Sequence, residues 1–285
     1  MKNKISITIN EKILRDVDSI VDNIFIRNRS QAIEYLIKKS MKETKIAVIL
    51  AGEGLSSSSE KIKNRYSLRI NNLAIIEHAL KKFHDSGFRN IYIVAPHETL
   101  TNVFKIVGNG SNFNVKIEYV DEETQEGSAS ALKLLNGKIK TTFLVVQCDL
   151  IITYVNLLDI WNKHLQEKAV ATMLICSDVQ PKNQVRYGHV CLNGNKIISY
   201  EEKPLLKRLK SSIFFAGIFV AEPEILKCRG RSLEYELFPE LAKRGLLLGH
   251  ISDLPHLHIH TKEDLKRVKK ILNEIAKKKM NNSPF

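Results

Sequence analysis

The sequence predicts an α/β protein of two parts, a short N-terminal unit of residues 1–44 and a doubly wound sheet domain of residues 45–285. Three observations predict this organisation. One alternating strand and two amphipathic helices fill the first part, and apolar runs alternate with helices in the second. Apolar residues make up 44% of the 285 residues, which is enough to bury a sizeable core.

The N-terminal unit begins with KISITI (residues 4–9), in which isoleucines alternate with polar residues as in a half-buried strand. Asn10 is placed to cap a helix, and residues 11–24 carry apolar side chains at helical spacing. A second helix, capped by Ser30, is predicted over residues 27–43. One strand and two short helices cannot close a core alone, so we expect the strand to pair with its copy in a homodimer.

Residues 3–43 resemble the ribbon-helix-helix family of DNA-binding regulators in this alternation, this cap and the RSQAI start of the second helix. The resemblance implies double-stranded DNA as partner, with a two-stranded ribbon in the major groove and no cofactor needed for binding. Base edges would be contacted by Lys4, Ser6 and Thr8, and a phosphate by Arg29 and Ser30. The alternative is a plain dimerisation arm with a solvated polar face.

Charge and composition narrow the class of partner. The formal net charge of +13 favours a polyanion, although a lysine-rich surface is an equal alternative. We expect a cytoplasmic protein with no membrane partner, because no stretch approaches the roughly 20 apolar residues of a membrane span and the N-terminus lacks a signal-peptide pattern. The four cysteines lie far apart, which argues against a disulfide framework or a zinc knuckle.

The second part carries the buried strands of a parallel sheet. Apolar runs occupy residues 46–50, 90–95, 143–147 and 170–176, with an amphipathic helix over residues 72–87 between the first two. Ligands of a doubly wound sheet bind beyond the carboxyl ends of its strands. The C-terminal residues 267–285 are predicted to contain a packed helix with a basic tail.

Several motifs, in this order, resemble the sugar-1-phosphate nucleotidyltransferase family across nearly all of residues 45–285. They are AVILAG (47–52), IIEHAL (75–80), EGSASAL (126–132), VVQCDL (145–150), YGHV (187–190) with YEEKP (200–204), AGIFVAEPEIL (216–226) and HIHTKEDL (258–265). The resemblance implies a Rossmann-like domain with a mixed, mainly parallel sheet. It also implies a reaction in which a sugar phosphate attacks the α-phosphorus of a nucleoside triphosphate and pyrophosphate leaves.

The resemblance also implies site residues, by matching positions. Nucleotide binding falls to the loop residues Ala51, Gly52 and Gly54 and to Gly127 and Ser128. Sugar binding falls to Tyr187, Gly188, Glu202 and Lys203, whereas Phe215 replaces an asparagine that commonly contacts the sugar. Asp149 matches a metal-binding aspartate, and His258 stands at the position of the second one. The metal there would be Mg²⁺ or, with a histidine ligand, a transition metal.

Two departures weaken the implied chemistry. The family's arginine for the triphosphate falls among Leu55, Ser56 and Ser57, which carry no charge. Its lysine position aligns with Arg65, with Lys61 and Lys63 as stand-ins. Loss of one preorganised charge-stabilising group typically costs about 2.7–4 kcal/mol of transition-state stabilisation. We therefore expect the catalytic chemistry to have been lost.

The sequence thus predicts a DNA-binding transcriptional regulator whose nucleotidyltransferase-like domain senses a nucleotide, a sugar phosphate or a nucleotide sugar, or serves as an oligomerisation platform. Its dimers could pair further into tetramers. The alternative is an active sugar-1-phosphate nucleotidyltransferase with an autoregulatory DNA-binding arm, and a third hypothesis is a scaffold with no ligand. His256, His258 and His260 share one strand face, and we expect either a metal site or three edge histidines there.

Overall fold

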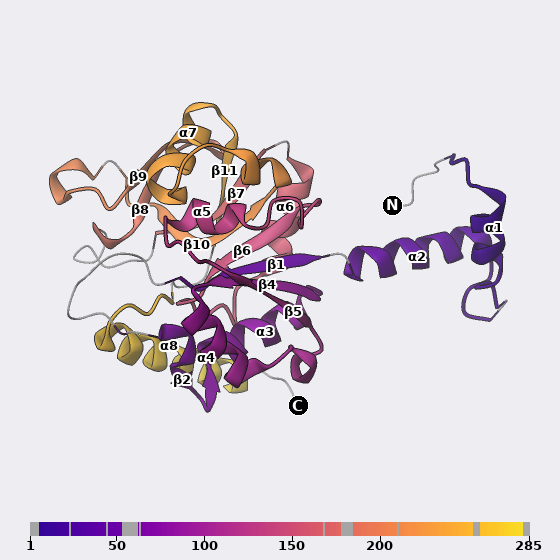
Figure 1. Cartoon of the computed structure of the whole chain (residues 1–285), viewed down its shortest axis with the longest axis horizontal. Helices are drawn as coiled ribbons and strands as arrows, with labels where there is room; N and C mark the ends of the chain where they lie inside the picture. The colour runs from indigo at the N-terminus through magenta and orange to yellow at the C-terminus, as the bar shows by residue number, and fades with distance from the viewer. Residues whose placement is uncertain are drawn as a thin grey trace. The chain divides into compact units, whose positions relative to one another are not determined.

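The computed structural model, drawn in Figure 1, describes residues 6–22, 24–43, 45–52, 62, 64–167, 169–177, 185–209, 211–252 and 257–281. Contacts between residues divide the chain into two units, Met1–Thr44 and Lys45–Phe285. The first unit contains two helices, and the second contains the sheet with its flanking helices.

The first helix of the N-terminal unit, α1 (Glu11–Asp18), is capped as predicted. The side-chain oxygen of Asn10 accepts a hydrogen bond from the Lys12 backbone N–H at 2.9 Å. The helix ends at Asp18 and does not reach residue 24, because Asp22 organises a turn there instead. Its carboxylate oxygen accepts backbone N–H bonds from the three residues Ile24, Phe25 and Ile26.

The second helix, α2 (Arg29–Glu43), begins one residue before Ser30, so the predicted Ser30 cap is wrong. Asn28 takes that place, since its side-chain oxygen accepts the Gln31 backbone N–H at 3.0 Å. Residues 6–10 form no strand within the described chain, and Lys4 lies outside the described residues. The ribbon therefore stays a prediction.

The second unit, Lys45–Phe285, is called the sheet unit. Within the described residues its sheet has nine strands, in the order β5-β4-β1-β6-β10-β7-β11-β9-β8. The strands are β1 (Ile46–Leu50), β4 (Asn90–Ala95), β5 (Lys116–Asp121), β6 (Phe143–Gln147), β7 (Ala171–Cys176), β8 (Gly188–Asn193), β9 (Lys196–Glu202), β10 (Phe214–Ala221) and β11 (Leu247–Ile251). A short hairpin of β2 (Arg69–Ile70) and β3 (Leu73–Ala74) stands apart from this sheet. The bounds predicted for β1, β4 and β6 are confirmed.

The sheet is mixed, as expected, but its antiparallel share is larger than predicted. Strands β5, β4, β1 and β6 run parallel to one another, and β11 runs parallel to β7. By contrast β10 is antiparallel to β6 and β7, and β8 and β9 form an antiparallel hairpin. The short connection between Asn193 and Lys196 permits only an antiparallel pair, whereas a parallel pair needs a long crossover.

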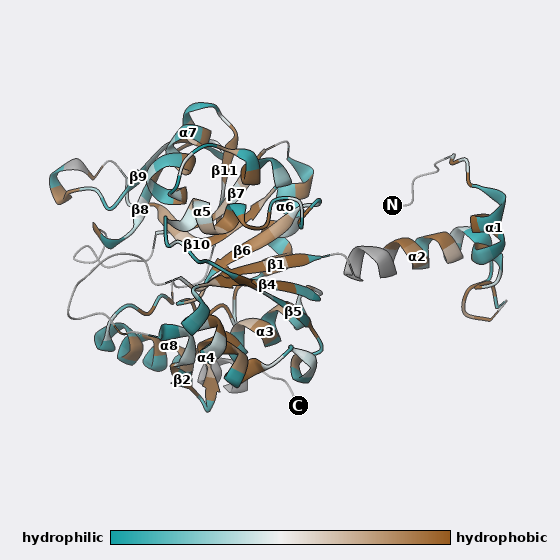
Figure 2. Ribbon diagram, in the orientation of Figure 1, coloured by the Kyte–Doolittle hydropathy of each residue, from teal (hydrophilic) through white to brown (hydrophobic). Residues whose placement is uncertain are grey.

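Helices cover both faces of the sheet, so its strands are apolar on both sides. They are α3 (Ile75–Asp85), α4 (His97–Val107), α5 (Ser128–Lys133), α6 (Leu157–Gln166), α7 (Phe238–Lys243) and α8 (Lys262–Asn281). Ala47 and Ile49 of β1 pack into one buried cluster, and Val48 between them packs into the other. Figure 2 shows hydrophobic residues concentrated along these central strands. The near-continuous apolar runs of the sequence follow from this double burial.

The C-terminal helix α8 belongs to a third, smaller cluster of buried residues. Its Val268 and Leu272 pack with Ile70 of β2 and with Leu257 and Ile259, which precede the helix. Among the described residues, no helix combines the length and the apolar character that crossing a bilayer requires. The importance of this cluster is that it fixes the backbone on both sides of His258.

Candidate functional site

The carboxyl ends of β1 and β6 lie side by side, since the two strands pair in parallel from Ile46 with Phe143 to Leu50 with Gln147. Ala51 and Gly52 follow β1, and Asp149 follows β6 two residues beyond its end. The structure therefore brings Gly52, at the start of the predicted glycine loop, and the predicted metal carboxylate to one edge of the sheet. Gly54 and residues 55–57 lie outside the described residues.

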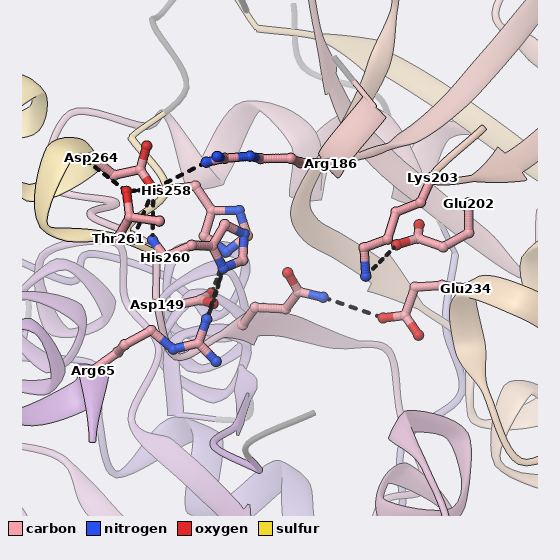
Figure 3. A network of polar contacts seen from close by, with 11 residues as sticks. Arg65, Asp149, Arg186, Glu202, Lys203, Glu234, His258, His260, Thr261 and Asp264 are labelled. Atoms are coloured by element: carbon pink, nitrogen blue, oxygen red, sulfur yellow. Dashed lines mark hydrogen bonds and ion pairs between the residues drawn. The ribbon is translucent and has the colours of Figure 1, made fainter. Parts of the chain in front are cut away.

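Asp149 is the centre of a buried polar network, drawn in Figure 3. One carboxylate oxygen, Oδ2, lies 2.6 Å from Nη1 of Arg65, and the other, Oδ1, lies 2.5 Å from Nε2 of His258. The same Nη1 lies 2.8 Å from Nδ1 of His260. The side chains of Arg65 and Asp149 are only 12% and 8% exposed, so this pair is removed from water.

Backbone pairing brings His258 to Asp149. Leu150 and His258 form an antiparallel bridge, and the Ile259 N–H donates to the Asp149 carbonyl at 3.0 Å. Leu257 and Ile259 point into the cluster beneath α8, so strand alternation turns His258 to the opposite face. His258 and His260 share a face, as predicted, and their ring centroids are 3.9 Å apart. His256 lies outside the described residues.

His260 is held by the start of α8. Oδ2 of Asp264 accepts the backbone N–H groups of His260 and Thr261 at 3.1 and 2.9 Å, and the Asp264 N–H donates to the Thr261 hydroxyl at 3.2 Å. This reciprocal arrangement is a capping box, in which a Thr and an acidic residue three positions later satisfy one another's backbone groups. The HTKED sequence (residues 260–264) thus both caps helix α8 and fixes the backbone of His260.

The charges of the network are set by burial and by proximity. Burial alone would raise the pKa of Asp149, but the charge and hydrogen bond of His258 and the charge of Arg65 outweigh it and hold that pKa well below its usual range. For His260, burial is the largest effect and the neighbouring His258 adds to it, so the pKa falls to about 3. His260 is therefore neutral at pH 7, and its Nδ1 accepts a hydrogen bond from Arg65.

Asp149, His258 and His260 form a group that could hold a metal ion, because one ligand atom of each lies within 4.8 Å of the others. The group does not fit Mg²⁺, which prefers six oxygen ligands in an octahedron. Two of its three donors are imidazole nitrogens, which suit transition metals, and both carboxylate oxygens already have partners. These three residues are therefore not a site for Mg²⁺.

Gly127 and Ser128 begin α5 against the chain segment at residues 231–234. The Ala129 N–H donates to the Arg231 carbonyl at 2.8 Å, and the Ser128 hydroxyl accepts the Leu233 N–H at 2.9 Å while donating to Glu234. A Cβ atom on Gly127 would lie 2.7 Å from that carbonyl oxygen. The predicted nucleotide segment is thus tightly packed, and the Ala129 and Ser130 N–H groups already have the Arg231 carbonyl as acceptor.

The predicted sugar residues are brought together by the β8–β9 hairpin, in which Gly188 faces Glu202 and the Lys203 N–H donates to the Tyr187 carbonyl at 3.1 Å. The Tyr200 hydroxyl donates a hydrogen bond to Glu202 Oε2 at 2.9 Å. A Cβ atom on Gly188 would lie only 1.9 Å from that hydroxyl oxygen and would collide with it. Burial raises the pKa of Glu202, because water is excluded from its carboxylate. The Tyr187 ring points the other way and stacks on Phe214.

Phe215 lies in the core and packs edge-on against Tyr200 and Phe238. Its side chain is 6% exposed, which explains how an apolar residue is accommodated at this position of β10.

A cavity of about 950 Å³ lies beside these segments, beyond the carboxyl end of β5. It is lined by acidic residues, by basic residues and by a few neutral ones, namely Asp121, Glu122, Glu123, Glu126, Glu236, Lys133, Arg229, Arg231, Thr124, Ser130, Leu134 and Gly230. The position of a Cβ at Gly52 would be 3.2 Å from Oε2 of Glu122, so the cavity adjoins Gly52. Sequence reasoning missed Glu122, which no motif singled out.

The ionisation of Glu122 gives a first testable prediction. Its side chain is buried, and burial raises its folded pKa from 4.5 to about 6. A carboxyl with a raised folded pKa holds its proton better in the folded state, so it costs stability as the pH rises from about 4.5 to about 6. Glu122→Gln should therefore raise the free energy of unfolding at pH 8 by about 2 kcal/mol, since one pKa unit corresponds to about 1.4 kcal/mol.

Denaturant unfolding at pH 4 and pH 8 checks this prediction. At pH 4, below both pKa values, the carboxyl is mostly protonated in both states, and the free energy of unfolding of the variant should then be close to that of the wild type. Glu123→Gln, at the exposed neighbouring position, is the matched control. An equal gain at both pH values would show that ionisation is not the cause.

Of the predicted DNA-binding residues, Ser6, Thr8, Arg29 and Ser30 are described and all are exposed. Arg29 makes a two-pronged ion pair with Asp18, at 2.6 and 2.9 Å, which joins the start of α2 to the end of α1. This pair lowers the pKa of Asp18 through the hydrogen bond from the guanidinium. Sequence reasoning missed this pair, as it missed the contact of Arg65 with Asp149, because neither partner is near the other in the sequence.

A family model described as nucleotidyl transferase matches residues 46–240. A UTP--glucose-1-phosphate uridylyltransferase of Synechocystis is 29% identical over 191 residues, which are 60% of this chain and 48% of that protein. A mannose-1-phosphate guanyltransferase of Aspergillus oryzae is 27% identical over 191 residues, covering 64% of this chain and 50% of that protein. This chain spans about half the length of these relatives.

The fold also matches a solved structure. A Bacillus anthracis protein assigned as a glucose-1-phosphate thymidylyltransferase aligns with a TM-score of 0.67 over 80% of this chain and 95% of that one. Its sequence identity of 22% supports a shared fold and nothing finer. The predicted α/β architecture of the sheet unit is thereby confirmed.

Proposed function

Because this chain belongs to the nucleotidyl transferase family, we propose that its sheet unit joins a nucleoside triphosphate to a sugar 1-phosphate. An oxygen of the sugar phosphate forms a bond to the α-phosphorus, the bond from that phosphorus to the bridging oxygen breaks, and pyrophosphate leaves. The observation that carries the proposal is the placement of Gly52 and Asp149 at the carboxyl ends of two paired strands. Ligands of such sheets bind at that edge.

The residues of the chain have separable roles in this proposal. The cavity next to Gly52 receives the nucleoside, since its mixed charges offer donors and acceptors for a base and a ribose. The β8–β9 hairpin, with Glu202 and Lys203, receives the sugar. Arg65 is the cation near the reacting phosphate, and Asp149 and His260 fix its orientation. Preorganised positive charge is the main requirement of phosphoryl and nucleotidyl transfer.

A pyrophosphate-release assay with each nucleoside triphosphate and a panel of hexose 1-phosphates tests the proposal. Arg65→Met should reduce turnover by about 10²–10³-fold, the usual effect of removing one preorganised stabilising group. Arg69→Met is the matched control, because the Arg69 guanidinium instead donates to the Asn72 carbonyl at 2.8 Å. Absence of pyrophosphate with every pair of substrates would contradict nucleotidyl transfer.

One observation favours a second candidate, a domain that binds such ligands without transforming them. Both oxygens of Asp149 are engaged by Arg65 and His258, so the site is electrostatically satisfied before any ligand arrives. A sensing domain needs binding, whereas an enzyme must also supply charge to the transition state. Calorimetric binding of a nucleotide or nucleotide sugar, with no pyrophosphate release, would establish this candidate.

For the N-terminal unit we propose the ribbon-helix-helix role, in which two copies pair and bind the major groove of DNA. Its support is the shortage of a core, since Val17 and Ala32 are buried while Ile7, Ile13, Ile24, Phe25, Tyr35 and Ile37 are substantially exposed. A second copy would cover these apolar side chains. The unit would then link DNA occupancy to ligand binding by the sheet unit.

DNA fragments selected from a random pool by the full chain provide the probe for this role. Lys4→Ala with Thr8→Ala should abolish sequence-specific gel shifts and leave the sedimentation coefficient unchanged, since the polar face of the ribbon is not its dimer face. Ile13→Glu with Ile37→Glu should instead lower the sedimentation coefficient. Wild-type DNA binding by the first double variant would refute the groove-reading assignment.

A further inference from the structure

Arg65 lies inside the group of possible metal ligands. Its Nη1 contacts Oδ2 of Asp149 at 2.6 Å and Nδ1 of His260 at 2.8 Å, and these are atoms through which both residues would bind a metal. Figure 3 shows the guanidinium reaching this point from one side and the two imidazoles from the other. The position that a metal ion would take is therefore occupied by a positive charge that belongs to the chain.

From this geometry we infer that Asp149, His258 and His260 form a concealed site for a transition-metal ion, which the Arg65 guanidinium closes. The donor set of one carboxylate and two imidazoles suits Zn²⁺ and similar ions. A divalent cation and a guanidinium on one buried carboxylate at these distances repel one another strongly, because the Arg65 and Asp149 side chains are largely removed from water. Metal binding therefore requires the departure of the Arg65 side chain and the loss of the proton held between His258 Nε2 and Asp149 Oδ1.

The ligand set is already arranged by backbone hydrogen bonds. Residues 257–259 pair with residues 149–151, and the cap of α8 holds the His260 N–H. Arg65 instead comes from a single short turn, Arg65–Ser67, on a different part of the chain. Its long side chain can move without disturbing the histidines, and a metal ion would need only small adjustments of their rings.

Calorimetric titration with Zn²⁺ tests the inference on the full chain. Arg65→Met keeps most of the aliphatic side chain and removes the charge. We expect the wild type to show no stoichiometric binding that depends on His258, and Arg65→Met to bind one Zn²⁺ per chain. Adding His258→Asn to Arg65→Met should remove that binding, which also separates it from zinc held by the free cysteines.

Two further variants serve as controls. Arg65→Lys keeps a positive charge near Asp149, so it should bind Zn²⁺ much less tightly than Arg65→Met does. Arg69→Met removes an arginine four residues away, whose guanidinium donates to the Asn72 carbonyl outside the group, and it should behave as the wild type. A gain in Arg69→Met equal to that in Arg65→Met would overturn the inference.

The remaining outcomes are also decisive. Tight wild-type Zn²⁺ binding that His258→Asn abolishes would show that Arg65 does not close the site. A folded Arg65→Met protein, judged by circular dichroism, that gains no affinity would show that the three residues are no metal site. If Arg65→Met fails to fold, Arg65→Gln replaces it, and we expect the same gain of Zn²⁺ binding. The wild-type titration does not depend on either variant. None of these readouts depends on transferase activity, so the proposed function can fail independently.

Discussion

Asp149→Ala is expected to lower the free energy of unfolding by about 3–5 kcal/mol, the usual consequence of removing one member of a buried ion pair. The substitution leaves the Arg65 guanidinium, 12% exposed, without its carboxylate, and removes the partner 2.5 Å from His258. Chemical denaturation at pH 7 measures the loss. The large effect arises because the buried positive groups cannot recover their hydration in the folded state.

The pH dependence of the free energy of unfolding provides a check on the contribution of the Asp149 carboxylate. The folded pKa of Asp149 is lowered, so its contribution to stability is present above the unfolded pKa of 3.8 and is lost as the pH falls toward the lower folded value. The difference in free energy of unfolding between the wild type and Asp149→Ala should therefore become smaller only in strong acid. Asp159→Ala is the control, because Asp159 forms a similar pair with His250 at 2.9 Å but its side chain is 59% exposed. Equal losses from both substitutions would show that burial is irrelevant.

Gly127→Ala is expected to destabilise the sheet unit through two separate effects. The residue has φ +130° and ψ 169°, a conformation open essentially to glycine, and forcing another residue into it costs about 1–3 kcal/mol. Its new Cβ would also lie 2.7 Å from the Arg231 carbonyl oxygen, and overpacking of this kind costs a further ~1–3 kcal/mol. That carbonyl accepts two backbone N–H bonds of α5, so the start of the helix cannot shift freely.

Gly137→Ala separates the two effects. Gly137 also has a positive φ, +83°, but nothing lies within 4 Å of its added Cβ. It should therefore show the conformational cost without the collision, and Gly127→Ala should be the less stable of the two in thermal unfolding. Because Arg231 lines the cavity, which in our proposal receives the nucleoside, nucleotide binding should also weaken in Gly127→Ala and not in Gly137→Ala. Equal melting temperatures for the two variants would refute the proposed collision.

The fold was largely predictable because its evidence is local. The strand at Ile46–Leu50 and the helix cap at Asn10 each depend on a few neighbouring residues, and both were found. The end of α1 and the cap of α2 were misjudged because side chains of Asp22 and Asn28 compete for backbone N–H groups, and apolar spacing does not report that competition. The extent of the antiparallel half was also missed, since strand direction depends on distant pairing.

The site was predictable only where a motif marks the residue. Asp149 and His258 were matched by position, and the structure brings them together. Arg65 was matched as well, but its engagement with Asp149 was not foreseen, since 84 residues separate the two in the chain. Glu122 was missed altogether, because its importance comes from burial beside Gly52 and not from any pattern of neighbours.

The capping of α8 has a dynamic consequence for the residues around Asp149. One oxygen of Asp264 both starts the helix and tethers the amide of His260, so fraying of the first helical turn releases that imidazole at the same moment. Protection of the 260 and 261 amides against hydrogen exchange should then rise and fall together with the helix. The start of helix α8 would in this way control how long the His258 and His260 rings remain together beside Asp149.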